Sequence, residues 1–333
     1  MSSEKKTDFA KIIIYSALSA AAVLGLWMLK NPRFQLIPSG LMLTGAVAFF
    51  VEMLIFKLFR RRRAVKLLLI LIVNISLFAS GIIYYFAPAV ILQPHQDNDA
   101  YESLKTVSGV EEITFDAAVG SINGWLYRTS DAAPVILYFY GNYETASTAI
   151  RRISAGYESS AFYGYNVAVF DYPAYGNSEG ICTDEALEQF ALDAFDEIKK
   201  YYSDVVVFGY SVGTGPATYL ACKRDASALI LYAPYYNGID LYNNVIDIFH
   251  GGLEKLVAFN IESGKYAESV TEKAFIAASA GDKVIPIESS LALARKLINV
   301  SFFDASDIGH NDFFSNSAVK AATVKFLEEV SGK

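Results

Sequence analysis

Cysteine and histidine are scarce in this chain of 333 residues, which has only two of the first and three of the second. Cys182 and Cys222 are too few for a disulfide-stapled scaffold or for a structural zinc site built from thiolates. Basic residues are also fewer than acidic ones. The net charge is −7, and no basic stripe with interleaved aromatic residues occurs, so nucleic-acid binding is disfavoured. No dinucleotide fingerprint, P-loop or metal motif is present, and the sequence therefore implies no cofactor and no metal.

What the chain has in abundance is apolar residues, at 53%, and an uneven distribution of charge. This apolar content excludes a disordered protein, which needs low hydrophobicity and high net charge. Residues 1–96 carry 11 Lys and Arg against 3 Asp and Glu, whereas residues 97–333 carry 17 against 32. Such asymmetry indicates two parts that work in different surroundings.

Three long apolar runs lie in the first part, at about 12–29, 36–56 and 67–92. The first and third contain no charged residue, and Glu52 is the one interruption of the second. A helix of 18 residues is about 27 Å long, close to the thickness of the hydrocarbon core of a bilayer. We therefore predict that residues 1–93 form a membrane anchor of three transmembrane helices.

Basic residues predict the orientation of this anchor. Arg60 to Arg63 stand together in the loop between the second and third runs, whereas the loop before it carries only Lys30 and Arg33. The positive-inside rule places the arginine-rich loop and the N-terminus in the cytoplasm. Three spans then put the rest of this multi-pass protein on the extracytoplasmic side. If the second run is re-entrant, the downstream part faces the cytoplasm instead.

Strand-like and helical segments alternate in the second part. Six apolar runs have the composition of strands that are buried on both faces. They occupy residues 134–140, 166–171, 205–209, 228–232, 273–280 and 300–304. Two further strand candidates, 111–116 and 122–129, come first, and 184–202 is the clearest helix. The alternation predicts an α/β fold, with a mostly parallel sheet and helices on both of its faces.

The run at 205–209 leads directly into G-Y-S-V-G at 209–213, and a helical stretch follows. The pattern G-x-S-x-G between a strand and a helix is typical of a nucleophile elbow, which presents the serine at the carboxyl edge of the sheet. Ser211 is therefore the predicted nucleophile. The N–H of Val212 would face the position where an oxyanion forms. The alternative is an ordinary glycine-rich loop, against which the flanking strand and helix argue.

A nucleophilic serine needs a histidine base that is held in one tautomer by a carboxylate. His310 lies in the loop just after the last predicted strand and is the predicted base, whereas His250 lies before the last two strands and is read as a lid or surface residue. Asp282 follows the penultimate strand, from which a carboxylate can reach the loop after the last one. It is the predicted acid, with Asp304 and Asp307 as rivals.

A second oxyanion donor is expected in the loop after the strand at 134–140. That loop begins with Gly141, where the lack of a side chain lets the backbone approach a substrate oxygen. The N–H of Asn142 is the predicted donor, with that of Tyr143 as the alternative. A plain turn at this place is the other interpretation.

Taken together, these motifs resemble the α/β-hydrolase superfamily. The similarity is narrower to its membrane-anchored serine hydrolases, relatives of serine aminopeptidase-like and dienelactone hydrolase-like proteins. The matching segments are 140–142, 171–180, 209–213, 281–286 and 309–312, in family order. The resemblance covers roughly residues 105–330 and implies a Ser-His-Asp hydrolase. Tyr140 departs from the pattern, because the family usually has a histidine there, and so do Pro173 and Ala174, which replace a basic residue and a glycine.

The expected organisation is an anchor, a linker at 94–104, and a catalytic α/β-hydrolase domain at 105–333 with a small lid at about 235–272. The expected activity is hydrolysis of an ester or thioester in a small-molecule, lipid or acylated substrate, because a membrane tether keeps the site near lipid. A serine peptidase is the alternative within enzymes. A catalytically inactive hydrolase fold that serves as a binding protein is the alternative outside them.

Overall fold

The structure is a computed structural model, and it describes residues 51, 54–55, 64–75, 91–245, 247, 250–251, 254 and 259–331. The chain divides into two units. One consists of Met1–Pro88 and Lys255–Ala258, and the other of Ala89–Glu254 and Phe259–Lys333.

In the first unit, residues 64–75 are helical, and several of their apolar side chains are exposed. The Asn74 side chain donates to the Ile70 carbonyl one turn earlier, at 2.8 Å. None of the helices described is at once long enough and apolar enough to cross a membrane. The three predicted spans lie for the most part outside the described residues, so the anchor stays a prediction.

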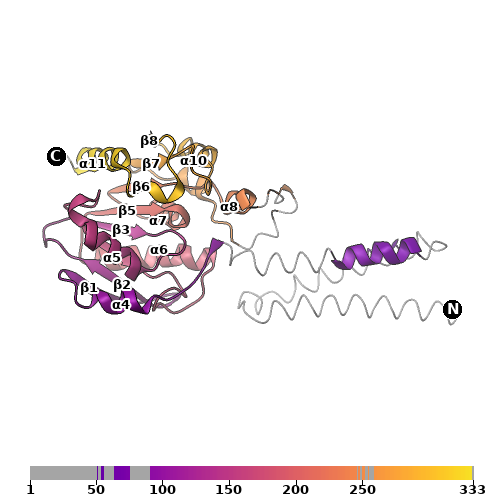
Figure 1. Ribbon diagram of the computed structural model, residues 1–333, viewed down its shortest axis with the longest axis horizontal. Helices are drawn as coiled ribbons and strands as arrows, with labels where there is room; N and C mark the ends of the chain where they lie inside the picture. The colour runs from indigo at the N-terminus through magenta and orange to yellow at the C-terminus, as the bar shows by residue number, and fades with distance from the viewer. Residues whose placement is uncertain are drawn as a thin grey trace. The chain divides into compact units, whose positions relative to one another are not determined.

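A mixed sheet of eight strands forms the core of the second unit (Figure 1). Its strands are β1 (Val110–Ala117), β2 (Gly120–Tyr127), β3 (Val135–Phe139), β4 (Asn166–Phe170), β5 (Val205–Tyr210), β6 (Ala228–Tyr232), β7 (Ala274–Ala278) and β8 (Val300–Asp304). They are arranged in the order β1-β2-β4-β3-β5-β6-β7-β8. The pairs β1–β2 and β2–β4 are antiparallel, and every other pair is parallel.

Helices surround this sheet. They are α4 (Asn98–Leu104), α5 (Ala146–Gly156), α6 (Asp184–Lys199), α7 (Thr214–Lys223), α8 (Gly238–Val245), α9 (Ser263–Ala267), α10 (Ile287–Ala294) and α11 (Ser317–Ser331). Short 3-10 turns occupy Tyr157–Ser159 (η2), Ser211–Gly213 (η3) and His310–Asp312 (η5). Every residue of β3 to β7 is buried, as expected where helices cover both faces of a sheet.

The eight predicted strands are confirmed, with ends that differ by one or two residues. The helix predicted at 184–202 is α6, which begins after Thr183, whose side chain accepts from the Ala186 N–H. The segment predicted as a linker contains α4, where Ala100 and Leu104 are fully buried. In the region predicted as a lid, α8 and α9 are described, whereas most residues from 246 to 258 lie outside the described part.

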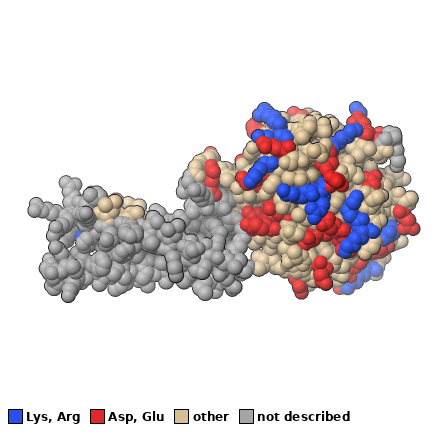
Figure 2. Space-filling model, turned by 180° about the vertical axis from the view of Figure 1, so that it is seen from behind, with Lys and Arg blue, Asp and Glu red and all other residues tan. Residues whose placement is uncertain are grey.

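The surface of the second unit carries charges of both signs. On the face seen in Figure 2, acidic and basic side chains alternate over the domain without a continuous basic patch.

Candidate active site

The strand β5 ends in a sharp turn that carries Ser211. Ser211 has a φ of 54°, in the left-handed region that non-glycine residues seldom adopt, and only 5% of it is exposed. Gly213 permits the turn, because a Cβ there would lie 2.2 Å from the Phe139 carbonyl oxygen. Helix α7 begins at the next residue, so the turn joins a strand to a helix. Strained backbone of this kind is concentrated at functional sites.

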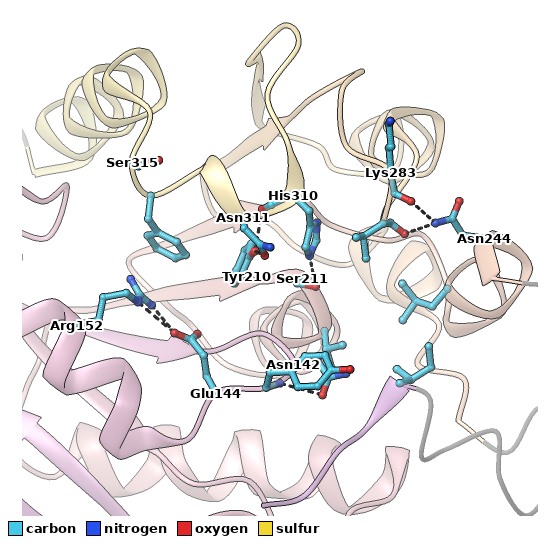
Figure 3. A pocket seen from close by; sticks show the side chains of 16 residues that line it. Asn142, Glu144, Arg152, Tyr210, Ser211, Asn244, Lys283, His310, Asn311 and Ser315 are labelled. Atoms are coloured by element: carbon cyan, nitrogen blue, oxygen red, sulfur yellow. Dashed lines mark hydrogen bonds and ion pairs between the residues drawn. The ribbon is translucent and has the colours of Figure 1, made fainter. Parts of the chain in front are cut away.

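Ser211, His310 and Asp282 come from three different loops and meet at this turn. The Ser211 Oγ lies 2.9 Å from His310 Nε2 (Figure 3), and His310 Nδ1 lies 2.7 Å from Asp282 Oδ2. The Asp282 side chain is 1% exposed and that of His310 is 12% exposed. A carboxylate at Nδ1 keeps a proton on that nitrogen and leaves Nε2 to accept the serine proton. This chain of hydrogen bonds is therefore able to activate the serine.

The rival residues lie elsewhere. Asp304 and Asp307 are exposed, and Asp304 Oδ1 accepts from the Ser306 N–H at 2.8 Å. His250 is exposed and pairs with Asp247 at 2.7 Å. Of the candidates described, Asp282 is the carboxylate that contacts His310, and His310 is the histidine that contacts the serine.

Residues that the sequence analysis did not single out hold the histidine loop. The Tyr210 hydroxyl donates to the His310 carbonyl at 2.8 Å, and the two rings stack at 5.3 Å. The buried Ser279 hydroxyl lies 2.8 Å from the Ile308 carbonyl oxygen and accepts from the Ile308 N–H at 3.0 Å. Because Ser279 follows β7, it ties the loop of Asp282 to the loop of His310.

The predicted oxyanion donors lie beside the nucleophile. Asn142 and Val212 both line the cavity that contains Ser211. The Tyr143 N–H donates to Asn142 Oδ1 at 3.1 Å and is thus already engaged, which favours Asn142 over Tyr143 as the donor. Gly141 allows this close approach, because a Cβ there would lie 2.8 Å from the Tyr210 ring.

Tyr140, at the position where the resembled family usually has a histidine, is fully buried. Its ring stacks on that of Tyr172 at 4.1 Å between centroids, with 23° between the ring planes. Beside this pair lies the buried carboxylate of Asp171, which accepts from the Ala146 N–H at 2.7 Å and from the Asn177 N–H at 3.3 Å. Burial raises the pKa of Asp171 to about 6, and these N–H donors limit the rise.

A cavity of about 800 Å³ opens above Ser211. One side of its wall is charged, since Arg152 Nη2 contacts Glu144 Oε1 at 2.9 Å (Figure 3). The apolar part of the wall is formed by Ile91, Leu241, Val284 and Phe314. The cavity therefore offers both apolar and charged surface to a ligand.

Solved structures of two esterases are similar to this domain and identify its fold. The esterase Pf2001 of Pyrococcus furiosus superposes with a TM-score of 0.57 at 14% identity, over 72% of this chain and 97% of that one. Est1E of Butyrivibrio proteoclasticus, with ferulic acid bound, gives 0.54 at 18% identity, over 66% and 100%. The domain has the α/β-hydrolase fold. Within it, Ser211, His310 and Asp282 are arranged as in a serine hydrolase.

Among curated proteins, the chain is similar to lysophosphatidylserine lipase ABHD12. It is 35% identical to the Gallus gallus protein over 140 residues and 37% identical to the Bos taurus protein over 154. These matches cover 40% and 44% of this chain but only 34% and 37% of those relatives. An alpha/beta hydrolase domain-containing protein of Caenorhabditis elegans, aho-3, is 30% identical over 97 residues, which is 26% of this chain and 29% of that protein. No family model matches.

Proposed function

We propose that this protein hydrolyses an ester or thioester through an acyl-enzyme formed on Ser211. The observation that carries the proposal is the unbroken hydrogen-bond chain from Ser211 through His310 to Asp282 below an open cavity. His310 Nε2 takes the proton of the Ser211 hydroxyl as Oγ attacks the carbonyl carbon. The N–H groups of Asn142 and Val212 then hold the oxyanion.

The same residues complete the cycle. The protonated His310 gives its proton to the leaving alcohol or thiol, and the carbonyl re-forms as an acyl-enzyme. Water then attacks the acyl carbon and gives a proton to His310, which passes that proton to Ser211 Oγ as the acid leaves. Asp282 holds the histidine throughout and is itself held in place, because its Oδ1 accepts from the Val284 N–H at 2.8 Å and the Ile285 N–H at 2.9 Å.

An amphiphilic lipid ester is the substrate class that fits the cavity best. Its apolar wall suits an acyl chain, while Glu144 and Arg152 offer charge to a polar head group. The Gallus gallus and Bos taurus relatives are lysophosphatidylserine lipases, but the matched region spans only about a third of their length. A lysophospholipid is therefore the first substrate class to test rather than a carried-over activity.

Membrane attachment through residues 1–93 is part of the proposal, with the catalytic domain on the extracytoplasmic side. It is supported by the three apolar runs and by the arginines at 60–63. Resistance of the full chain to alkaline carbonate extraction tests the attachment. Protease added outside sealed cells or vesicles tests the side. Digestion of the domain only after the membrane is opened would overturn the extracytoplasmic placement.

The experiment that tests the activity is labelling with a fluorophosphonate probe in membranes. Wild type should label, Ser211→Ala should not, and the exposed Ser159→Ala should label like wild type. Absence of labelling in folded wild type would contradict an activated serine and favour the binding-protein alternative. Lysophospholipids, acyl thioesters and aminoacyl anilides assayed side by side then separate the esterase from the peptidase.

A further inference from the structure

The chain that enters the hydrolase domain passes over the active-site edge of the sheet. Ile91 and Leu92 are buried, at 7% and 3% exposure, and Ile91 lines the cavity above the nucleophile. These residues are the last two of the apolar run at 67–92. The segment that leads in from the predicted anchor is thus part of the active-site wall.

Gln93, the next residue, joins two loops at this edge. Its backbone N–H donates to the Tyr175 hydroxyl at 2.8 Å, and its side-chain Nε2 donates to the Tyr143 hydroxyl at 2.9 Å. Tyr175 lies in the loop after β4, and Tyr143 lies in the loop after β3. Two residues later, the His95 carbonyl accepts from the Gly176 N–H at 2.9 Å. A single glutamine therefore bridges the segment to the loop that carries the predicted oxyanion donor.

Tyr143 needs such support. It has a φ of 64°, in the left-handed region where a tyrosine is strained. The residue is 69% exposed, so packing does little to hold its side chain. Its N–H donates to the side chain of Asn142, the residue before it, at 3.1 Å. Because Asn142 and Tyr143 share a peptide bond, a change in the strained conformation of Tyr143 would also move the backbone next to Asn142.

The segment is itself fixed on its other side. Asp97 caps α4, since its Oδ1 accepts from the Ala100 N–H at 2.8 Å. In that helix, Leu104 is fully buried and Tyr101 packs edge-on against Trp125 at 5.3 Å. The backbone that follows Gln93 is thus fixed to the domain, so that Gln93 can restrain Tyr143.

We propose that Gln93 is a positioning residue of the active site. Through the Tyr143 hydroxyl it holds the oxyanion loop, the loop after β3 that carries Asn142, in its working conformation. The inference rests on the proposed hydrolase function. If Gln93 has this role, the segment at 91–93 is a component of the catalytic site. The contact that shapes the oxyanion loop then comes from the residue directly after the third apolar run. Displacement of that segment would loosen the loop without touching Ser211, His310 or Asp282.

The test is the kinetics of fluorophosphonate labelling of the full chain in membranes, resolved into the maximal rate and the half-saturating probe concentration. Gln93→Ala should lower the maximal rate about three- to tenfold, as expected for one lost hydrogen bond, and leave the half-saturating concentration unchanged. Gln93→Glu should restore most of the rate, because its carboxylate can accept from the Tyr143 hydroxyl. Gln189→Ala removes an exposed glutamine whose Nε2 donates to Asp193 Oδ1 within α6, and it should have no effect.

A double-mutant cycle makes the inference specific to this pair. Tyr143→Phe alone should slow labelling as Gln93→Ala does, and the double variant should be no slower than either. Equal rates in wild type and Gln93→Ala, or additive effects of the two changes, would overturn the positioning role while the hydrolase stands. Wild type that does not label would overturn both. A lower melting temperature in Gln93→Ala without rescue by Gln93→Glu would mark a merely structural role.

Discussion

Tyr140 and Tyr172 form a reciprocal pair of hydrogen bonds at the base of the oxyanion loop. The Tyr172 N–H donates to the Tyr140 hydroxyl at 3.0 Å, and the Tyr172 hydroxyl donates to the Tyr140 carbonyl at 2.6 Å. Both residues are buried, so neither partner can turn to water instead. The tyrosine that departs from the family pattern at position 140 thus has its own structural reason, because it ties the loop after β3 to the loop after β4.

Tyr172→Phe tests this pair. The substitution leaves the ring stack intact but removes the donor to the Tyr140 carbonyl, which stays buried and unsatisfied. We expect the free energy of unfolding to fall by about 1–3 kcal/mol. Urea denaturation of the purified chain in detergent measures the change. Tyr163→Phe, at a tyrosine that is 65% exposed, serves as the control and should unfold like wild type. A Tyr172→Phe variant as stable as wild type would mean that the carbonyl finds another donor.

The Asp171 carboxyl predicts a pH dependence of stability. Burial raises its pKa from 3.8 to about 6 in the folded protein. Between these two values the folded state binds the proton more tightly than the unfolded state does, so stability falls as pH rises through this range. The free energy of unfolding falls by about 3 kcal/mol in all over this range, and the loss is complete above pH 6.

Asp171→Asn isolates that contribution, since the amide does not titrate. Unfolding free energies measured from pH 4 to pH 7 should decline more steeply with pH in wild type than in the variant. The loss of one N–H acceptor shifts the variant curve by a constant and leaves the difference in slope intact. Parallel curves would mean that the carboxyl of Asp171 titrates near its ordinary pKa in the folded protein.

The sheet and the meeting of Ser211, His310 and Asp282 could be predicted from the sequence for a shared reason. Strands buried on both faces appear as continuous apolar runs, and in a parallel arrangement the residues that follow β5, β7 and β8 meet at one edge. Ser211 directly follows β5, and Asp282 and His310 lie in the loops after β7 and β8, although β8 itself is partly exposed. Their convergence needed no knowledge of side-chain packing.

The contacts that shape the oxyanion loop could not be predicted in this way. Tyr140 and Tyr172 are 32 residues apart, and Gln93 and Tyr143 are 50 apart, so no local periodicity links the partners. The helix α4 is a different case. Asp97 is a good N-cap type, and Ala100 and Leu104 have helical spacing, so a signal was present within the segment that was read as a linker.

Asp282→Asn tests which carboxylate orients the base. An asparagine cannot stabilise the protonated His310 and allows the wrong tautomer, so kcat should fall by about 10⁴-fold. Asp304→Asn is the matched control, because Asp304 is exposed and is the last residue of the neighbouring strand β8. It should retain wild-type turnover of the same ester substrate. A large loss in Asp304→Asn with activity kept in Asp282→Asn would reverse the assignment.

Gly141→Ala tests the fit of the oxyanion loop against the nucleophile turn. The added Cβ would lie 2.8 Å from Tyr210 Cδ1 and 3.4 Å from Ser211 Cβ. The distance to Tyr210 is too short for two carbon atoms that are not bonded. The loop or the Tyr210 ring must move, and Tyr210 also holds the His310 carbonyl. We expect kcat to fall about 10²- to 10³-fold, as when one oxyanion donor is lost.

The control for this change is Gly156→Ala, at the end of α5. There the nearest atom to a new Cβ is Ser159 Oγ at 4.0 Å, so the methyl group has room. Turnover and labelling of Gly156→Ala should equal those of wild type, whereas Gly141→Ala should stay folded by circular dichroism and lose both. Full activity in Gly141→Ala would show that the loop after β3 does not approach the reacting carbonyl, and the oxyanion donor would then have to be sought outside Asn142.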